Sequence, residues 1–137
     1  MKRLLTLGML ALIVVCATAQ TDTLRGHWLC KSAGVHLYLD LGAETLEVPH
    51  YEFLGKVNGY MRGNISDTWF LTTFRYEKDG TWTLRFSNDS GADTQEVRLQ
   101  RAGGGALRYK AIGTNYVRRA VRKKWVYLPA EMDFEPV

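Results

Sequence analysis

The sequence predicts an all-β fold, in which an antiparallel up-and-down meander of about eight strands closes into a small barrel. Three observations support this prediction. Apolar and polar residues alternate with a period of two from residue 24 onward, which is typical of strands with one buried and one solvated face. Polar or glycine-rich reversals separate these runs at intervals of about 8–12 residues. No stretch after residue 24 shows the apolar stripe of an amphipathic helix.

Length and composition agree with one globular domain. The chain has 137 residues, of which 46% are hydrophobic and 23% are charged, and it contains 13 Gly, 3 Pro and 2 Cys. These figures provide for one apolar core. They exclude low-complexity disorder, a collagen, a disulfide-dense scaffold and a large multi-domain enzyme. We expect a single domain over residues 20–137.

Residues 1–19 have the organisation of an export signal. Met1-Lys2-Arg3 is basic, the run from Leu4 to Val15 is apolar, and Ala17-Thr18-Ala19 offers the small residues that a signal peptidase recognises. We expect cleavage after residue 19 and a secreted or periplasmic protein without a transmembrane segment.

Two alternatives to a cleaved signal remain open. Cys16 follows the apolar run and would be the acylated residue of a lipoprotein, although Val14-Val15 places no small residue directly before it. An uncleaved anchor is the other alternative, although the run is shorter than the ~20 residues that a spanning helix needs.

Cleavage changes both the charge and the cysteine count. Lys2 and Arg3 belong to the signal, so the 18 basic residues become 16 against 14 acidic residues. A net charge this close to zero argues against a nucleic-acid partner. Cys30 remains as a single cysteine, which excludes an intramolecular disulfide. We expect a buried, inert thiol; the alternative is an exposed thiol that reacts or pairs between chains.

The strands are expected in the following order. Leu24, Gly26, Trp28 and Cys30 share one face of the first strand, and Val35, Leu37, Leu39 and Leu41 share one face of the second. The stretch from Ala43 to Gly63 is irregular, and Pro49 interrupts a strand candidate at Leu46–Val48, so a longer loop or an edge strand is expected there. Alternation returns at 69–77, 81–88, 96–100 and 107–111.

The reversals between these later strands have recognisable turn residues. Lys78-Asp79-Gly80 separates 69–77 from 81–88, and Asp-Gly favours a tight hairpin. Ser87–Gly91 and Ala102–Gly105 are two further polar or glycine-rich reversals. Trp69 and Trp82 lie on adjacent strands of the predicted hairpin, so we expect them to pack across it.

Basic residues cluster near the end of the chain. The cluster runs from Arg118 to Lys124, and Trp125-Val126-Tyr127-Leu128-Pro129 follows it. One interpretation is a long strand with solvated basic side chains. The other is a patch for an anionic partner, formed by Arg118, Arg119, Arg122, Lys123 and Lys124. The partner would be an anionic polymer such as a sulfated or uronic polysaccharide, an outer-leaflet lipid headgroup or an acidic protein.

Gly26-His27-Trp28, at the start of the first strand, resembles the Gly-x-Trp motif that opens the barrel of lipocalins and related calycins. The resemblance implies a lipocalin-like barrel whose floor Trp28 closes. It also implies a late-strand arginine, here Arg118, Arg119 or Arg122, stacked across Trp28 as a clasp worth about 0.5–2 kcal/mol. It further implies that a small apolar molecule is held inside. The wall of that site would comprise Trp28, Trp82, Leu84, Phe86, Val97, Leu99, Leu107 and Tyr109.

The sequence contains no convincing group of catalytic or metal-ligating side chains. His36 and Asp40 share one face of a strand but lie ~13 Å apart along it, and His50 with Glu52 would supply only two ligands. Cys30 has no recognisable base or oxyanion loop for nucleophilic catalysis, and no cofactor motif occurs. We therefore expect a protein that is not an enzyme and has no catalytic residue, metal or cofactor. Two functions remain: binding of a small apolar ligand in the barrel, or a filled barrel that binds a partner through the basic residues or a sheet edge.

Overall fold

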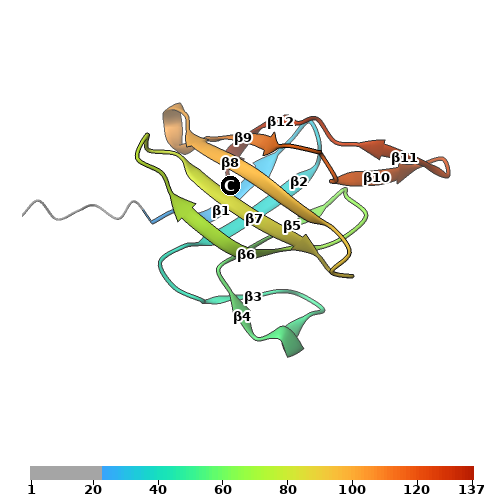
Figure 1. Ribbon diagram of the computed structural model, residues 1–137, viewed down its shortest axis with the longest axis horizontal. Coiled ribbons are helices and arrows are strands. Elements are labelled where there is room, and N and C mark those ends of the chain that lie inside the picture. Colours follow the sequence, from blue (N-terminus) through green and yellow to red (C-terminus); the bar gives the residue numbers. More distant parts are fainter. Residues whose placement is uncertain (1–22) are drawn as a thin grey trace, which may run out of the picture.

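A computed structural model describes residues 23–137, and the expected export signal lies outside the described residues. Within the described part, eight strands form a closed antiparallel barrel in which the last strand pairs with the first (Figure 1). They are β1 (Arg25–Cys30), β2 (Val35–Asp40), β5 (Gly59–Gly63), β6 (Trp69–Tyr76), β7 (Trp82–Asn88), β8 (Thr94–Arg101), β9 (Leu107–Ile112) and β12 (Glu131–Pro136). The predicted all-β fold, an antiparallel up-and-down meander of about eight strands closed into a small barrel, is confirmed.

Two strand pairs are inserted into this meander. β3 (Leu46–Glu47) and β4 (Lys56–Val57) lie between β2 and β5, with the short 3-10 helix η1 (Glu52–Leu54) between them. β10 (Arg118–Val121) and β11 (Lys124–Tyr127) lie between β9 and β12. In Figure 1 the first pair sits below the barrel, and the second projects away from its side.

The first hairpin explains the glycine two residues before Trp28. A side chain at Gly26 would place its Cβ 3.3 Å from the Trp28 ring, and the φ of Gly26 is +151°. The absence of a side chain therefore leaves room for the indole. The indole N–H of Trp28 donates a hydrogen bond of 2.9 Å to the carbonyl of Gly105, in the turn η2 (Gly103–Gly105) that joins β8 to β9. This bond ties β1 to the glycine-rich turn.

The irregular stretch after β2 is held by the carboxylate of Asp40. This buried carboxylate accepts hydrogen bonds from the Thr45 hydroxyl and, at 3.2 Å, from the Ala43 N–H. The hydrogen bond from Thr45 is the main reason that the pKa of Asp40 is lowered. The stretch predicted as a loop or edge strand contains β3, η1, β4 and β5.

The central meander follows the predicted turns, with one correction. The Asp79 carboxylate accepts hydrogen bonds from the N–H and the hydroxyl of Thr81, at 3.1 and 2.6 Å, so the turn between β6 and β7 is confirmed. The predicted packing of Trp69 on Trp82 is wrong. In the register of this hairpin Trp69 lies opposite Asn88, and Trp82 lies opposite Tyr76. The two tryptophans are therefore at opposite ends of it.

The basic cluster does not form the single long strand that one interpretation predicted. The chain reverses at Arg122 and Lys123, so the cluster is divided between β10, a turn and β11. The closing barrel strand is β12 instead, where Met132 and Phe134 are buried and their neighbours are exposed. The physical reason is that a barrel strand needs apolar residues at every second position, which the basic cluster lacks.

Candidate functional site

The predicted ligand wall forms the packed centre of the barrel. Trp28 has an exposed fraction of 6%, Trp82 has 2%, and the other members have 0 or 1%: Leu84, Phe86, Val97, Leu99, Leu107 and Tyr109. Phe134, Met61 and Leu37 pack in the same cluster. All eight predicted wall residues are thus brought together inside the barrel, where they contact other side chains closely.

One buried polar atom of the described residues has no hydrogen-bond partner. It is the hydroxyl oxygen of Tyr109, and burial raises the pKa of this hydroxyl. We expect Tyr109→Phe to raise the free energy of unfolding by about 1 kcal/mol, because an unpaired buried hydroxyl is costly. Urea denaturation measures the change. A loss of stability would show instead that the hydroxyl is hydrogen-bonded in solution.

The expected clasp on Trp28 is wrong. Within residues 23–137 the arginine–tryptophan stacks join Arg101 to Trp82 and Arg118 to Trp125, whereas Trp28 is held by its hydrogen bond to Gly105. The candidates for this clasp were Arg118, Arg119 and Arg122, and all three lie on the β10–β11 hairpin, which is not part of the barrel sheet. The reversal after β10 places Trp125 beside Arg118, with the guanidinium 4.1 Å from the ring centre.

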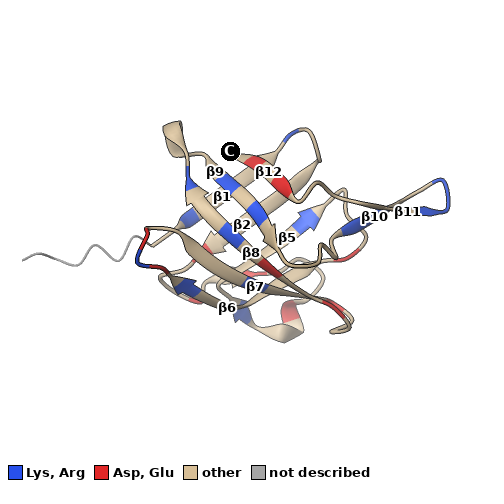
Figure 2. Ribbon diagram, turned by 45° about the horizontal axis from the view of Figure 1, so that its top comes forward, with Lys and Arg blue, Asp and Glu red and all other residues tan. Residues whose placement is uncertain are grey.

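The surface that stands out from the barrel is the β10–β11 hairpin, residues 118–127, which we call the arm. It contains all five residues of the predicted basic patch: Arg118, Arg119, Arg122, Lys123 and Lys124. No acidic residue occurs in it, and Figure 2 shows blue without red along its length. Arg118 and Arg119 are half-buried at its base, and the other three are exposed. The structure therefore brings the predicted basic residues together on one projection.

The base of the arm is firmly attached to the barrel. Val117 and Leu128, which flank the arm, are both buried in the core. The N–H of Leu128 donates to the carbonyl of Val117 at 2.9 Å, and the N–H of Ser66 donates to the carbonyl of Arg118 at the same distance. The side-chain amide of Asn115 donates to the carbonyl of Leu128 at 2.5 Å. These contacts fix the direction in which the arm leaves the barrel.

The tip of the arm is a strained turn. Arg122 and Lys123 have φ angles of 51° and 66°, in the left-handed region. A two-residue hairpin turn of this kind favours Asn-Gly, and a longer side chain there costs about 1–2 kcal/mol per residue. Two cations thus occupy the positions where the backbone least favours them, which is a feature more typical of functional than of structural residues.

Four other residues of the arm were assigned no role from the sequence. Val121, Trp125, Val126 and Tyr127 have exposed fractions of 43, 55, 45 and 54%. The signal that could have found them is the break in alternation at Arg122-Lys123-Lys124, followed by three large apolar or aromatic residues. Such a pattern predicts a hairpin with two solvated faces rather than a half-buried strand.

A second group of residues lies on the outer wall of β1, β2 and β5. His27 Nε2 lies 2.8 Å from His36 Nδ1, so one ring nitrogen donates to the other. His27 also stacks on Tyr38 with ring centres 4.1 Å apart, and Tyr38 stacks on Tyr60 at 4.5 Å. The sequence spacing hid this pair because the β1–β2 hairpin brings His27 opposite Tyr38 and Leu29 opposite His36.

The histidine pair predicts a pH dependence of stability. Burial, and then the charge of His36, lower the pKa of His27 below its ordinary value of 6.5. Below pH 6.5 the unfolded chain therefore binds more protons than the folded chain, so the free energy of unfolding is full above that pH and falls as the pH falls. We expect the denaturation midpoint to decrease from pH 7 to pH 5. His27→Gln should flatten this decrease; an unchanged slope in that variant would contradict the assignment.

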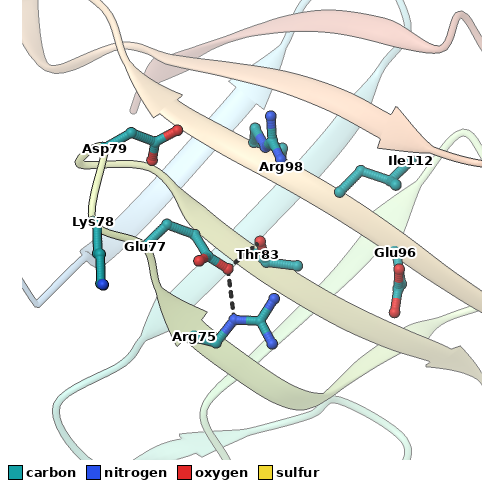
Figure 3. A pocket seen from close by; sticks show the side chains of 8 residues that line it. All are labelled: Arg75, Glu77, Lys78, Asp79, Thr83, Glu96, Arg98 and Ile112. Atoms are coloured by element: carbon teal, nitrogen blue, oxygen red, sulfur yellow. Dashed lines mark hydrogen bonds and ion pairs between the residues drawn. The ribbon is translucent and has the colours of Figure 1, made fainter.

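Polar hollows mark the outside of the barrel. One of them, with a volume of about 560 Å³, lies over β6, β7 and β8, and Figure 3 shows the side chains that line it. Inside it Glu77 accepts hydrogen bonds from Arg75 at 2.6 Å and from Thr83 at 2.9 Å. Because these charged groups already satisfy one another at the surface, this hollow is best described as a solvated ionic face.

Another hollow, of about 440 Å³, lies beside the loop that contains η1. Its wall includes Tyr51, whose hydroxyl donates to the Asp89 carboxylate at 2.6 Å. Burial, and then the charge of Asp89, raise the pKa of Asp67 in the same hollow. Arg62 lines it as well. With both signs of charge in its wall, this hollow indicates no single class of ligand.

Other sequence predictions have simple outcomes. Cys30 has an exposed fraction of 1%, which confirms the buried thiol. His50 donates its backbone N–H to Glu52 Oε1 at 3.1 Å, so these residues stabilise the start of η1.

Among residues 23–137, no group of three or more His, Cys, Asp or Glu has the arrangement of a metal site. The same residues contain no helix with the length and apolar character needed to cross a bilayer.

Comparison with known proteins adds no relative. No family model matches the chain, and no curated protein or solved structure matches it significantly. The resemblance to lipocalins therefore stays a prediction based on Gly26-His27-Trp28 and on the topology of the barrel.

Proposed function

We propose that this protein is an exported, non-catalytic binding module whose filled barrel holds the arm against an anionic macromolecule. The observation that carries the proposal is the concentration of charge: the arm has five basic residues and no acidic residue over residues 118–127. Positive charge gathered on a projection attracts an anionic partner and directs its approach.

The distribution of charge over the rest of the protein strengthens the argument. Residues 20–137 have 16 basic and 14 acidic residues, and five of the basic residues are in the arm. The rest of residues 20–137 therefore has 11 basic against 14 acidic residues. An anionic partner is attracted to the arm and repelled by the remainder, so the charge distribution selects both the partner and the orientation.

The packed barrel suits this role better than the role of a carrier. The residues that would form the wall of a ligand site are nearly inaccessible, at 0–6% exposure. Because Cys30 is the single cysteine of residues 20–137, no intramolecular disulfide stabilises the fold. The well-packed core provides this stability instead. Ligand binding inside the barrel remains the other prediction, and it needs these side chains to move apart.

The proposal includes export because residues 1–19 have the basic, apolar and small-residue segments of a cleaved signal peptide. The proposed location is therefore periplasmic or secreted. There the arm would meet anionic polymers, lipids or proteins outside the cytoplasm.

Replacement of the arm tip tests the proposed function. We expect Arg122→Asn/Lys123→Gly to bind dextran sulfate about tenfold more weakly than the unchanged protein, and both affinities to fall as salt rises. Asn-Gly suits the turn, so the variant loses charge without losing the hairpin. Fluorescence anisotropy of labelled polymer measures the affinity.

The matched control is Lys56→Gln/Lys78→Gln, which removes the same charge from exposed sites on β4 and on the turn between β6 and β7. This control should leave the affinity within about twofold. Equal weakening in both variants would show that net charge alone, rather than the arm, attracts the polymer. No binding by the unchanged protein to dextran sulfate or to anionic vesicles would contradict the proposed function.

A further inference from the structure

The arm exposes apolar side chains as well as positive charge. Its four large apolar residues are 43–55% exposed. Trp125 is the most exposed of them, whereas Trp28, Trp69 and Trp82 have exposed fractions of 6, 2 and 2%. A partner that attracted the arm by charge alone would leave this apolar surface in water, so the exposure indicates a partner that also buries it.

The register of the hairpin places a cation beside each apolar side chain. Arg118 is opposite Tyr127, and Ala120 is opposite Trp125, so the two aromatic residues share a face with Arg118. Arg119 is opposite Val126, and Val121 is opposite Lys124, so the two valines share the other face with Arg119 and Lys124. Both faces of the arm therefore combine apolar groups with positive charge.

This combination matches the boundary between lipid headgroups and acyl chains. Tryptophan and tyrosine are enriched there because one end of each side chain is apolar and the other is polar. Basic residues beside them interact with anionic headgroups. An anionic polysaccharide or nucleic acid would use the cations but would offer no apolar layer for Val121 and Val126.

We propose that the partner of the arm is a bilayer surface that contains anionic phospholipids, an inference that rests on the proposed function. Trp125 and Tyr127 on one face and Val121 and Val126 on the other enter the boundary with the acyl chains. Arg122, Lys123 and Lys124 contact the headgroup phosphates. The Arg118 guanidinium, 4.1 Å from the centre of the Trp125 ring, retains a favourable partner as water is removed from it.

The dimensions of the arm fit this location. Each of its strands has four residues, which span about 13 Å at 3.3 Å per residue. The arm is thus too short to cross a hydrocarbon core of about 30 Å, and it lies in the interface. The excess of acidic residues on the rest of residues 20–137 keeps the barrel away from the anionic surface.

The exposed Trp125 provides a direct test. The chain is expressed with its own first 22 residues and recovered after export, and it is mixed with phosphatidylcholine vesicles that do or do not contain phosphatidylglycerol. Acyl chains carrying bromine quench tryptophan emission on contact. We expect quenching only with phosphatidylglycerol present, and we expect Trp125→Phe to abolish it, because the other three tryptophans are buried in the barrel.

Two further variants separate charge from apolar contact. Arg122→Asn/Lys123→Gly should bind the anionic vesicles about 25-fold more weakly, at about fivefold for each cation lost, while Lys56→Gln/Lys78→Gln should bind them with unchanged affinity. Trp125→Ser/Tyr127→Ser should bind the vesicles about tenfold more weakly and dextran sulfate with unchanged affinity.

The outcomes distinguish this inference from the proposed function. Binding to dextran sulfate without binding to phosphatidylglycerol vesicles would overturn the lipid assignment and favour an anionic polymer. Vesicle binding without quenching by brominated chains, or without any effect of Trp125→Ser/Tyr127→Ser, would overturn it as well. If the protein binds neither dextran sulfate nor phosphatidylglycerol vesicles, both proposals are overturned.

Discussion

Truncation of Phe86 to alanine is expected to lower the free energy of unfolding by about 3–5 kcal/mol. Phe86 has an exposed fraction of 0% and packs in the core with the other predicted wall residues. Removal of its ring deletes apolar contacts and leaves a cavity that the surrounding strands cannot fill. Urea denaturation of the exported chain, followed by far-ultraviolet circular dichroism, measures the loss.

Two related variants make this result decisive. Phe53→Ala, at a position with an exposed fraction of 81%, should change the stability by less than about 0.5 kcal/mol. Phe86→Leu keeps most of the side-chain volume and should cost about 1 kcal/mol, so it remains measurable if the alanine variant does not fold. A loss below about 1 kcal/mol for Phe86→Ala would indicate an expandable interior and would favour a ligand inside the barrel.

Replacement of Gly63 by alanine is expected to cost roughly 3 kcal/mol or more, because strain and a backbone clash act together. The φ of Gly63 is +132°, and an added Cβ would lie 2.4 Å from the carbonyl oxygen of Gly34. That oxygen also accepts a hydrogen bond of 2.9 Å from the N–H of Asn64. The end of β5 would have to move away from the β1–β2 turn.

Gly91→Ala is the matched control for Gly63→Ala. Gly91 also has a positive φ, +73°, but nothing lies within 4 Å of an added Cβ. It should therefore show only the strain of a left-handed alanine, about 1–2 kcal/mol. Thermal unfolding of the two variants compares them directly. Equal losses would show that β5 does not approach the β1–β2 turn as closely in solution.

The arm and the barrel are stabilised by different contacts, so they should differ in how well they tolerate amino-acid substitutions. The barrel depends on apolar side chains that fill its centre, so most substitutions there carry a cost. The arm is fixed at its base by the buried Val117 and Leu128, and its residues from 120 to 127 are exposed. Its charge and apolar content can therefore be altered with little effect on the fold, which makes the arm suitable for testing binding separately from stability.

The sequence by itself determined the class of fold. Residues such as Trp82, Leu84 and Phe86 alternate with polar neighbours, and this period is local because successive side chains of a strand point to opposite faces. Asp79-Gly80 similarly determined a turn, since the Asp79 side chain and the freedom of Gly80 act within a few residues. The predicted basic patch was also visible, because it is continuous in the chain.

Only the tertiary structure decided which distant residues meet. Trp28 is held by the carbonyl of Gly105, 77 residues away, rather than by an arginine. His27 meets His36 because of the register of one hairpin, and Arg118 stacks on Trp125 because the chain reverses between them. The register of a hairpin depends on the type and length of its turn, and a contact between distant strands depends on the arrangement of the whole barrel. The alternation of residues along one strand therefore cannot specify these contacts.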